Sequence, residues 1–265
     1  MNLMNDAVRL EEGRLCGLED ISQYKWFKER HRVFPAVFEQ RQHKKILDLS
    51  AGVGCAAQRI RDLYDADLLC NDISPTCLKI LNKMGLATVS FDIDNPEKGL
   101  PFPDEEFDAL ISLVTIEHLM HPDHFLKEAC RILRNGAYFY LSTPNYAAPE
   151  YAGRLLLSGR MFHDPLGSEE SRYEFYSHVR YYTYRTLLEF VGSFGFAPET
   201  VYIALPGGSA RYKALFARSR VKALTFRYIM WFRHHLLSPR YASEPIVCFK
   251  KTKTAVIRRP KKVVL

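Results

Sequence analysis

The stretch ILDLSAGVG, residues 46–54, decides the fold more than any other part of the chain. An apolar run ends in an acid, and small residues follow at positions 50, 51, 52 and 54. Glycine lets the backbone turn sharply and approach a ligand, because no Cβ intervenes. The turn leads into a predicted helix, whose free N–H groups favour a carboxylate or a phosphate. The stretch therefore predicts a strand, a tight turn suited to ligand binding, and a helix.

Outward from this turn, strands and helices alternate. Short apolar runs predict further strands at 66–72, 87–94, 107–114 and 137–145. Helical spacing predicts helices at 55–64, 74–85, 121–136 and 182–196. Ser74, Pro75 and Gly85 fit the N-cap, first position and C-terminal stop of the second helix. This alternation indicates an α/β fold, a parallel sheet with helices on both faces, in which ligands lie beyond the carboxyl ends of the strands.

Composition excludes several classes of protein. With 47% hydrophobic and 13% aromatic residues in 265, the chain can bury a full core, so wholesale disorder is excluded. No stretch approaches the roughly 20 apolar residues that span a bilayer. The N-terminal residues lack the apolar region of a secretory signal. The six cysteines are scattered and form no CxxC pair, which favours reduced thiols and a cytoplasmic protein.

The chain divides into parts of different character. We expect a helical leader at 1–43, a core at 44–205 with an inserted cap at 146–180, a basic aromatic helical insertion at 206–243, a last core strand at 244–252 and a basic tail at 253–265. The insertion at 206–243, called here the basic segment, holds eight Lys or Arg residues and no acid, and 250–265 adds seven more. Since the net charge is +7, the rest of the chain is acidic, and the basic C-terminal part predicts an anionic partner.

A second acid follows the second predicted strand. Asp72 lies 18 positions beyond Gly54, where a carboxylate can accept both hydroxyls of a ribose. A nicotinamide cofactor would use the same arrangement. The glycine turn and Asp72 therefore leave a dehydrogenase and a methyltransferase equally open.

Two longer stretches separate these alternatives. They are SFDIDNPEKGLPFPDEEFDALISLVTIEHL at 90–119 and RILRNGAYFYLSTPN at 131–145. With the leader segment YKWFKERHR at 24–32, they resemble the class I S-adenosylmethionine-dependent methyltransferases over roughly residues 20–200. The resemblance implies a Rossmann-like, doubly wound, mostly parallel sheet of seven strands. The chain departs from the family at Ser50, which replaces a glycine, and at 134–137, where Asn135-Gly136 is expected to form the turn before the fifth strand.

The resemblance also implies S-adenosylmethionine as cofactor, with S-adenosylhomocysteine as product, and assigns residues to it. These would be Asp48, Ser50, Gly52 and Gly54 at the methionine end, Asp72 and Ile73 at the ribose and adenine, Asp92 and Ile93 at the adenine, and Ser112 and Leu113 beneath the sulfonium.

Catalytic candidates lie after the fourth strand and after the cap. A hydroxyl acceptor generally needs a base, and His118, with Glu117 beside it, follows the fourth strand. His178 follows the cap, where the family often places a histidine near the acceptor. His121 and His124 are expected on a solvated helix surface. Some similar methyltransferases bind a divalent ion through Glu-x-x-Glu-His, but Val114 replaces the first acid here, so no metal is expected.

The sequence says less about the methyl acceptor than about the cofactor. Overall similarity favours O-methylation of a small-molecule, sugar or lipid/glycan-linked acceptor. The alternatives are an RNA methyltransferase that uses the basic segment, or a non-catalytic S-adenosylmethionine-binding interaction module. The run ARYKALFARSRVKALTFRYIMWFRHHLL at 210–237 interleaves positive charge with aromatics, which fits peripheral contact with an anionic membrane, an RNA surface, or a lid or dimer-forming helix pair. No NPPY-type motif follows the fourth strand, which makes nucleic acid the less favoured partner.

Overall fold

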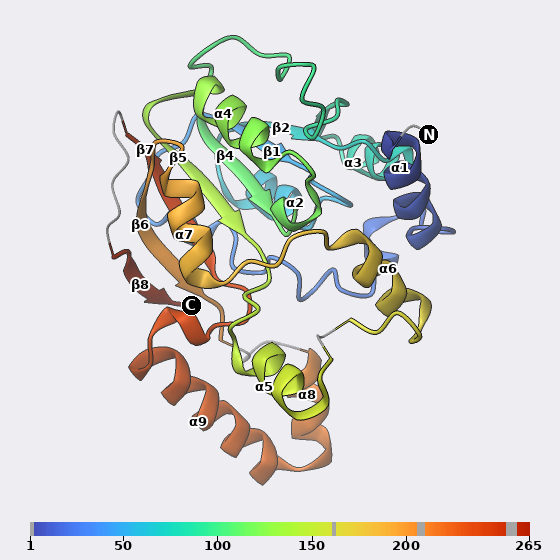
Figure 1. Cartoon of the computed structure of the whole chain (residues 1–265), viewed down its shortest axis with the longest axis vertical. Helices are drawn as coiled ribbons and strands as arrows, with labels where there is room; N and C mark the ends of the chain where they lie inside the picture. The colour runs from blue at the N-terminus through green and yellow to red at the C-terminus, as the bar shows by residue number, and fades with distance from the viewer. Residues whose placement is uncertain (1–2, 161–162, 206–209, 253–258) are drawn as a thin grey trace.

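A central sheet with helices on both sides organises the molecule (Figure 1). The computed structural model describes residues 3–160, 163–205, 210–252 and 259–265. Eight strands follow the order β3-β2-β1-β4-β5-β7-β6-β8, and β7 alone runs antiparallel to its neighbours among these strands. The strands are β1 Lys45–Leu49, β2 Asp67–Asn71, β3 Ala87–Val89, β4 Phe107–Leu113, β5 Leu133–Ser142, β6 Phe196–Ile203, β7 Ile246–Lys251 and β8 Lys261–Val264. The Rossmann-like fold is confirmed, with one strand more than the seven expected.

The helices fall into a core set and a peripheral set. Core helices are α2 Cys55–Leu63, α3 Pro75–Lys83, α4 Pro122–Ile132 and α7 Tyr184–Gly192. Peripheral helices are α1 Leu3–Arg14 in the leader, α5 Pro149–Ser158 and α6 Glu169–Ser177 in the cap, and α8 Ala210–Arg218 and α9 Arg220–Leu236 in the basic segment. Short 3-10 helices are η1 Ile21–Gln23, η2 Ala36–Phe38, η3 Ile116–His118 and η5 Pro239–Tyr241. The leader is therefore helical only in part. Over the described ranges, we find no helix both long and apolar enough to span a bilayer.

Strand β4 shows how the core is built on both faces of the sheet. Its side chains alternate, so Leu110 packs in the cluster that contains Phe125 of α4, while Ile111 packs in the cluster that contains Ile60 of α2. All four are fully buried. A strand buried on both faces has no polar side, which is why 109–114 is apolar except for Ser112 near the carboxyl end of the strand.

Two local expectations need correction. Helix α4 ends at Ile132 and β5 begins at once with Leu133, which pairs with Phe107, so Asn135-Gly136 lies inside β5 and not in a turn before it. A register shift between Phe107 and Ala109 accommodates the early pairing. The end of the basic tail is also a strand: β8 pairs in parallel with β6 and forms a sheet edge. Lysines on an edge strand disfavour pairing with other chains, and they disguise the strand in the sequence. The rest of the tail, at 253–258, lies outside the described residues.

Candidate functional site

The turn after β1 has a left-handed backbone at three positions. The φ angles of Ser50, Gly52 and Gly54 are 60°, 58° and 86°. A Cβ on Gly54 would lie 2.6 Å from Cε of Met84, so this glycine allows α3 to pack closely. A Cβ on Gly52 would have nothing within 4 Å. Gly52 therefore presents bare backbone to open space, where a ligand can approach it.

Asp72 joins this turn to the next helix. Its carboxylate accepts hydrogen bonds from the N–H of Gly52 at 2.8 Å and of Ser74 at 2.9 Å. Ser74 is the N-cap of α3, as the sequence predicted, and accepts from the N–H of Cys77. Burial raises the pKa of Asp72 to about 6 and that of Asp48 to about 8, where the charge of Asp72 adds to the effect. Both acids would ionise more readily beside a cationic ligand.

The other predicted cofactor residues lie at the same edge, because they follow parallel strands β1, β2 and β4 or the segment after β3. Ser112 is fully buried, and its hydroxyl has no hydrogen-bond partner within the described ranges. Ile93 is buried, and Asp92 accepts from the N–H of Asp94. An orphaned hydroxyl, open space at Gly52 and two buried acids fit the polar, positively charged cofactor that the resemblance implies. Ile73 and Leu113 flank them in sequence, half-buried and buried respectively.

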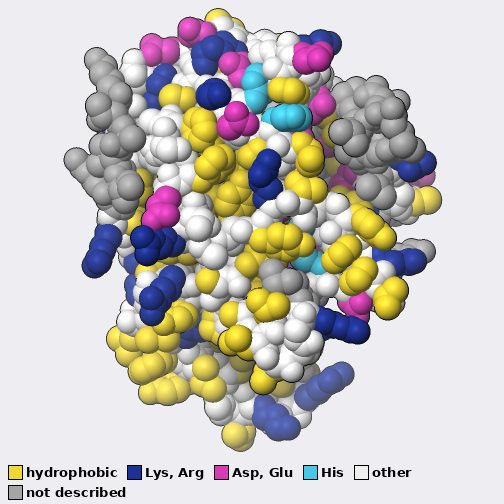
Figure 2. Space-filling view, viewed as in Figure 1, with side chains coloured by type: hydrophobic (Ala, Val, Ile, Leu, Met, Phe, Trp, Pro, Cys, Tyr) yellow, Lys and Arg dark blue, Asp and Glu magenta, His cyan; other side chains and the backbone are white. Residues whose placement is uncertain are grey.

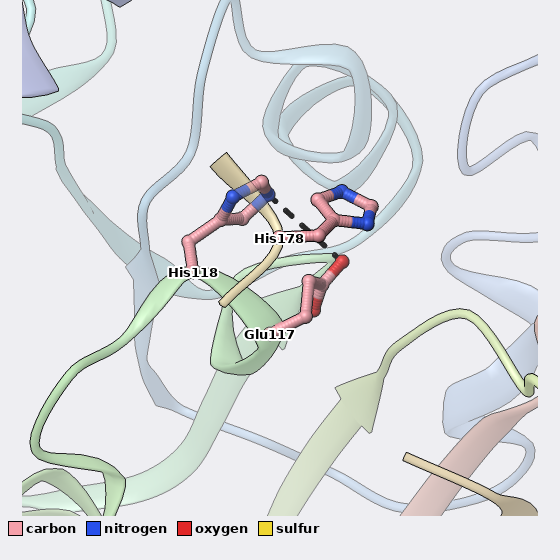
Figure 3. A group of neighbouring side chains, drawn as sticks. All are labelled: Glu117, His118 and His178. Atoms are coloured by element: carbon pink, nitrogen blue, oxygen red, sulfur yellow. Dashed lines mark ion pairs between the residues drawn. The ribbon is translucent and has the colours of Figure 1, made fainter. Parts of the chain in front are cut away.

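A cluster of acids and histidines lies beyond β4, where the cap returns to the core. We call Glu117, His118, His163, Glu174 and His178 the acid–histidine cluster. The carbonyl of Glu117 accepts from the N–H groups of residues 179 and 180, which holds the end of the cap against η3. Figure 3 shows Glu117, His118 and His178 turned toward one another, with the rings of the two histidines 4.7 Å apart. The structure thus brings together all three residues proposed for catalysis.

The hydrogen bonds of His118 fix its tautomer. Nδ1 lies 2.9 Å from the carbonyl oxygen of Ser177. A carbonyl only accepts, so Nδ1 carries the proton and Nε2 keeps its lone pair, 4.0 Å from Oε1 of Glu117. Burial, together with nearby His178, lowers the pKa of His118 to about 4. His118 is therefore neutral near pH 7, with a lone pair available to take a proton.

Glu117 is the most unusual member of the cluster. Its side chain is fully buried, and neither carboxylate oxygen has a hydrogen-bond partner in the part of the chain that the structure describes. Burial raises its pKa to about 8, so the carboxyl is largely protonated at neutral pH. A buried polar group without a partner costs stability, which indicates a role other than folding.

His178 sits in a chain of polar contacts. Its Nε2 lies 2.8 Å from Oε2 of Glu174, and its Nδ1 lies 2.7 Å from the hydroxyl of Tyr146. The same hydroxyl lies 3.1 Å from Nε2 of His163. Burial opposes ionisation of Glu174, but the contact with His178 outweighs it, and the pKa of Glu174 falls below its ordinary value. Glu174 and Tyr146 thus contact the two ring nitrogens of His178 and hold its ring in place.

Some of these side chains could hold a metal. Glu117, His118 and His178 offer ligand atoms within 4.8 Å of one another, and so do His163, Glu174 and His178. Val114 breaks the Glu-x-x-Glu-His pattern in the sequence, but the cap supplies donors that lie far from it along the chain. His121 and His124 stay apart from the cluster: His121 lies 3.5 Å from Asp94, and His124 contacts the carbonyl of Lys98.

The leader touches both halves of the site. Glu12 accepts from the hydroxyl of Ser74, and from the N–H and hydroxyl of Thr76 at the start of α3. Its neighbour Glu11 accepts from the hydroxyl of Tyr173 in α6, at 2.9 Å. Sequence reasoning missed these contacts, and also Tyr146, which directly follows the Pro-Asn pair that ends the family resemblance.

A cavity of about 410 Å³ lies between the leader and the sheet edge where β6 ends and β7 begins, and Glu174 of the acid–histidine cluster also lines it. Its volume suits a small organic molecule. Positive and negative side chains and aromatic rings face it. The lining residues are Arg14, Tyr24, Trp26, Glu29, Arg30, His31, Arg32, Val33, Glu174, Ala204, Glu244 and Ile246.

Comparison with known proteins finds a family match within the cofactor half. Residues 47–141 match the family model described as methyltransferase domain. Ajmaline N-methyltransferase of Rauvolfia serpentina is 30% identical over 103 residues, 37% of this chain and 35% of that protein. The ubiquinone/menaquinone biosynthesis C-methyltransferase of Bartonella henselae is 35% identical over 113 residues, 40% of this chain and 41% of that protein. The matched part thus spans well under half the length of these relatives.

The likeness in structure extends further along the chain. An S-adenosylmethionine-dependent methyltransferase from Thermotoga maritima has a TM-score of 0.57 and covers 91% of this chain and 99% of its own. Only 17% of the aligned residues are identical. The shared fold therefore includes parts beyond residue 141 in which little sequence is shared.

Proposed function

We propose that this chain is a class I S-adenosylmethionine-dependent methyltransferase and that it methylates a hydroxyl oxygen of its acceptor. The match of residues 47–141 to the methyltransferase domain and the shared fold support the first part of the proposal. The observation that carries the proposal is the acid–histidine cluster at the carboxyl edge of the sheet. A hydroxyl must lose its proton as the methyl group arrives, whereas an amine needs only to be bound deprotonated. A site that holds the neutral imidazole of His118 in a defined tautomer is suited to the first task.

The cofactor half has the residues for holding S-adenosylmethionine. The bare backbone at Gly52 and the carboxylates of Asp48 and Asp72 would face its methionine and ribose parts, and Ser112 would lie beneath the sulfonium. When bound, this cofactor supplies an already activated methyl group. Positioning the acceptor in line with that group then provides much of the rate acceleration.

His118 is our candidate for the base. Its Nε2 lone pair is directed by the bond from Nδ1 to the Ser177 carbonyl, and it faces the buried carboxyl of Glu117. His178 is the second candidate, because Glu174 orients it as the acid of a catalytic triad orients its histidine. The Tyr146 hydroxyl already contacts Nδ1 of His178 at 2.7 Å, which favours a positioning role for this residue.

We propose that the cluster transfers protons without a resident metal. Both ring nitrogens of His178 are within hydrogen-bonding distance of Glu174 or Tyr146, and Nδ1 of His118 bonds a carbonyl. A metal would have to displace at least one of these partners. The buried, protonated Glu117 would also have to lose its proton.

The cavity beside the cluster supports a small-molecule, sugar or lipid/glycan-linked acceptor. Its volume and its mixed lining of arginine, acid and aromatic side chains suit an acceptor with polar and apolar parts. The relatives named above include an N- and a C-methyltransferase, so the accepting atom must be tested directly.

The test follows the methyl carbon. The protein is incubated with methyl-¹³C-labelled S-adenosylmethionine and a panel of phenols, sugars, lipid-linked glycans, amines and short RNAs, and the product carbon is identified by NMR. We expect an O-methyl resonance with one of the hydroxyl acceptors, and its loss in His118→Asn. A label on nitrogen or carbon, or on RNA, would contradict the proposal. Calorimetry that shows cofactor binding without turnover on any acceptor would instead favour the non-catalytic module.

A further inference from the structure

Helix α9 presents a broad apolar arc to the outside of the molecule. Its exposed apolar residues are Val221, Leu224, Tyr228, Ile229, Trp231, Phe232 and Leu236, each between 45% and 74% exposed. At 3.6 residues per turn they cover an arc of roughly 160°. Ala223 and His234, on the opposite side, are buried against the protein. The helix therefore packs with one face and leaves a wide apolar face uncovered.

Positive charge borders this arc on both sides. On a helical projection, Arg220 and Arg227 fall at one edge, and Lys222 falls at the other. All three are exposed. The basic segment contains no acid that could neutralise them. Long cationic side chains beside an apolar arc are typical of helices that lie in a membrane interface.

Helix α5 extends the same end of the molecule (Figure 1). Its last turn exposes Leu156 and Leu157 at 85% and 91%. Arg233 of α9 forms an ion pair with Glu150 of α5, which ties the two helices together. Figure 2 shows hydrophobic side chains gathered toward this end, with Lys and Arg side chains around them. We call the exposed apolar residues of α5 and α9, with their bordering cations, the α5–α9 face.

The composition of the α5–α9 face distinguishes between three possible binding partners: nucleic acid, a second copy of the chain and a bilayer. Base stacking needs aromatic platforms, but Leu156, Leu157, Leu224 and Ile229 are aliphatic and cannot stack on bases. A second copy of the chain in a two-fold contact would place one acid-free basic segment against another, with like charges opposed. A bilayer with anionic headgroups satisfies both the apolar arc and its cations.

We propose that the α5–α9 face docks on the surface of a bilayer that contains anionic lipid. The same helix α5 reaches the acceptor side: the ring of Tyr151 lies 5.0 Å from that of Tyr146, whose hydroxyl bonds His178. About one turn later the helix exposes its leucines to the outside. Docking thus places the cap close to the headgroup layer, and the acceptor is a membrane-resident amphiphile with its hydroxyl end in the cap. This last step rests on the proposed function, whereas the docking does not.

The first experiment uses the full chain and two vesicle types. Binding to phosphatidylcholine vesicles with and without phosphatidylglycerol is measured by flotation. The protein has two tryptophans, so Trp26→Phe leaves Trp231 of α9 as the fluorescent reporter. We expect preferential binding to the anionic vesicles and a blue shift of Trp231 emission upon binding. Equal binding to both vesicle types would overturn the proposal.

Paired variants locate the surface. Leu156→Glu and Ile229→Glu should each weaken partition into vesicles by about tenfold. Each variant loses the favourable free energy of burying one aliphatic side chain, which corresponds to about that factor. Leu63→Glu is the matched control, because Leu63 of α2 is also exposed, at 71%, but lies outside the α5–α9 face. Lys222→Gln and Arg227→Gln should each cost about fivefold on anionic vesicles and leave binding to neutral vesicles unchanged. Circular dichroism and cofactor calorimetry confirm that each variant is folded.

Three further outcomes would contradict docking of the α5–α9 face on a membrane. If Leu63→Glu weakens binding as much as Leu156→Glu, the α5–α9 face is not the docking surface. If Ile229→Glu converts a dimer to a monomer in sedimentation and vesicles have no effect, the face joins two copies of the chain. If RNA binding is lost in Lys222→Gln and vesicle binding was never present, RNA is the partner. Each of these overturns the docking.

Vesicle binding without any cofactor binding would sustain the docking and refute the proposed function.

Discussion

The cofactor side and the acceptor side of this molecule are built by different means. On the cofactor side, backbone and short side chains at the ends of adjacent strands make the site, as at Gly52 and Asp72. On the acceptor side, long side chains from η3, the cap and its flanks meet across sequence separations of up to 61 residues, from Glu117 to His178. A site made of backbone is tied to the fold, whereas a site made of side chains on inserted elements can change its chemistry while the fold persists.

The largest effect should come from the proposed base. His118→Asn removes the Nε2 lone pair, and general base catalysis contributes about 10² to 10⁴ in rate, so kcat should fall by that factor. The affinity for S-adenosylmethionine should stay unchanged, which separates the two sides of the site. Turnover and calorimetry on the same preparation measure both.

The control for His118→Asn is His124→Gln, on the surface of α4. This variant should keep full activity. If kcat for His118→Asn stays within about twofold of the wild type, His118 is not the base, since a working base contributes far more. The base is then His178, or the reaction needs none.

The pH dependence of stability isolates Glu117. In the folded protein its pKa is raised to about 8, whereas in the unfolded chain it is ordinary, near 4.5. The unfolded state therefore releases this proton first, and the free energy of unfolding should fall by up to about 4 kcal/mol as the pH rises from 4.5 to 8. Glu117→Gln keeps the shape and cannot ionise, so its denaturation curve should lack this part of the decline. The free energy of unfolding of both proteins is measured by urea denaturation at several pH values. If it falls equally with pH in the two proteins, Glu117 is ionised in the folded state and the prediction is wrong.

On the cofactor side, Asp72→Asn should weaken binding of S-adenosylmethionine by about tenfold to a hundredfold, because a hydrogen bond to a charged group contributes about 1.5–3 kcal/mol. Asp67→Asn, at the exposed start of the same strand, is the matched control and should bind as the wild type does. Calorimetry gives both constants. Equal affinities in all three proteins would remove Asp72 from the cofactor site.

Gly54→Ala tests whether the backbone of the turn after β1 sets the packing on the cofactor side. A left-handed alanine is strained, and its Cβ would crowd Met84 and Leu81, so the free energy of unfolding should fall by about 2 kcal/mol. Gly85→Ala has a similar φ of 75° and open space around it, so it should lose only about 1 kcal/mol. Thermal and urea unfolding measure the difference. If the two variants lose the same amount, packing of α3 does not depend on Gly54.

The smallest expected effect is that of a chelator. If the cluster transfers protons without a metal, dialysis against EDTA should leave kcat unchanged. Loss of activity that returns with one divalent ion would show that Glu117, His118 and His178, with donors from the cap, do hold a metal.

Sequence alone predicted the local structure of the cofactor side well, because its signals are local, whereas the binding roles of these residues stay predictions. The acid, turn and N-cap at Asp48, Gly54 and Ser74 each depend on neighbours within a few residues, and the structure places them as expected at strand ends. The acceptor side was predicted in part. Glu117, His118 and His178 were named, but Tyr146, His163 and Glu174 were not, because their meeting depends on how the cap folds back. Strand β8 was missed since its lysines suit an edge and give no apolar run.

The leader helix α1 has a consequence for how binding on one side of the site affects binding on the other. Adjacent residues hold it to opposite partners, Glu12 to the start of α3 and Glu11 to Tyr173 of the cap. A ligand on either side that steadies its own partner also steadies α1, and so prepares the other side. By thermodynamic reciprocity, whatever factor the cofactor adds to acceptor affinity, the acceptor adds to cofactor affinity. Contacts through the leader can thus couple the two sides of the site, in addition to the direct contact between donor methyl group and acceptor that in-line transfer requires.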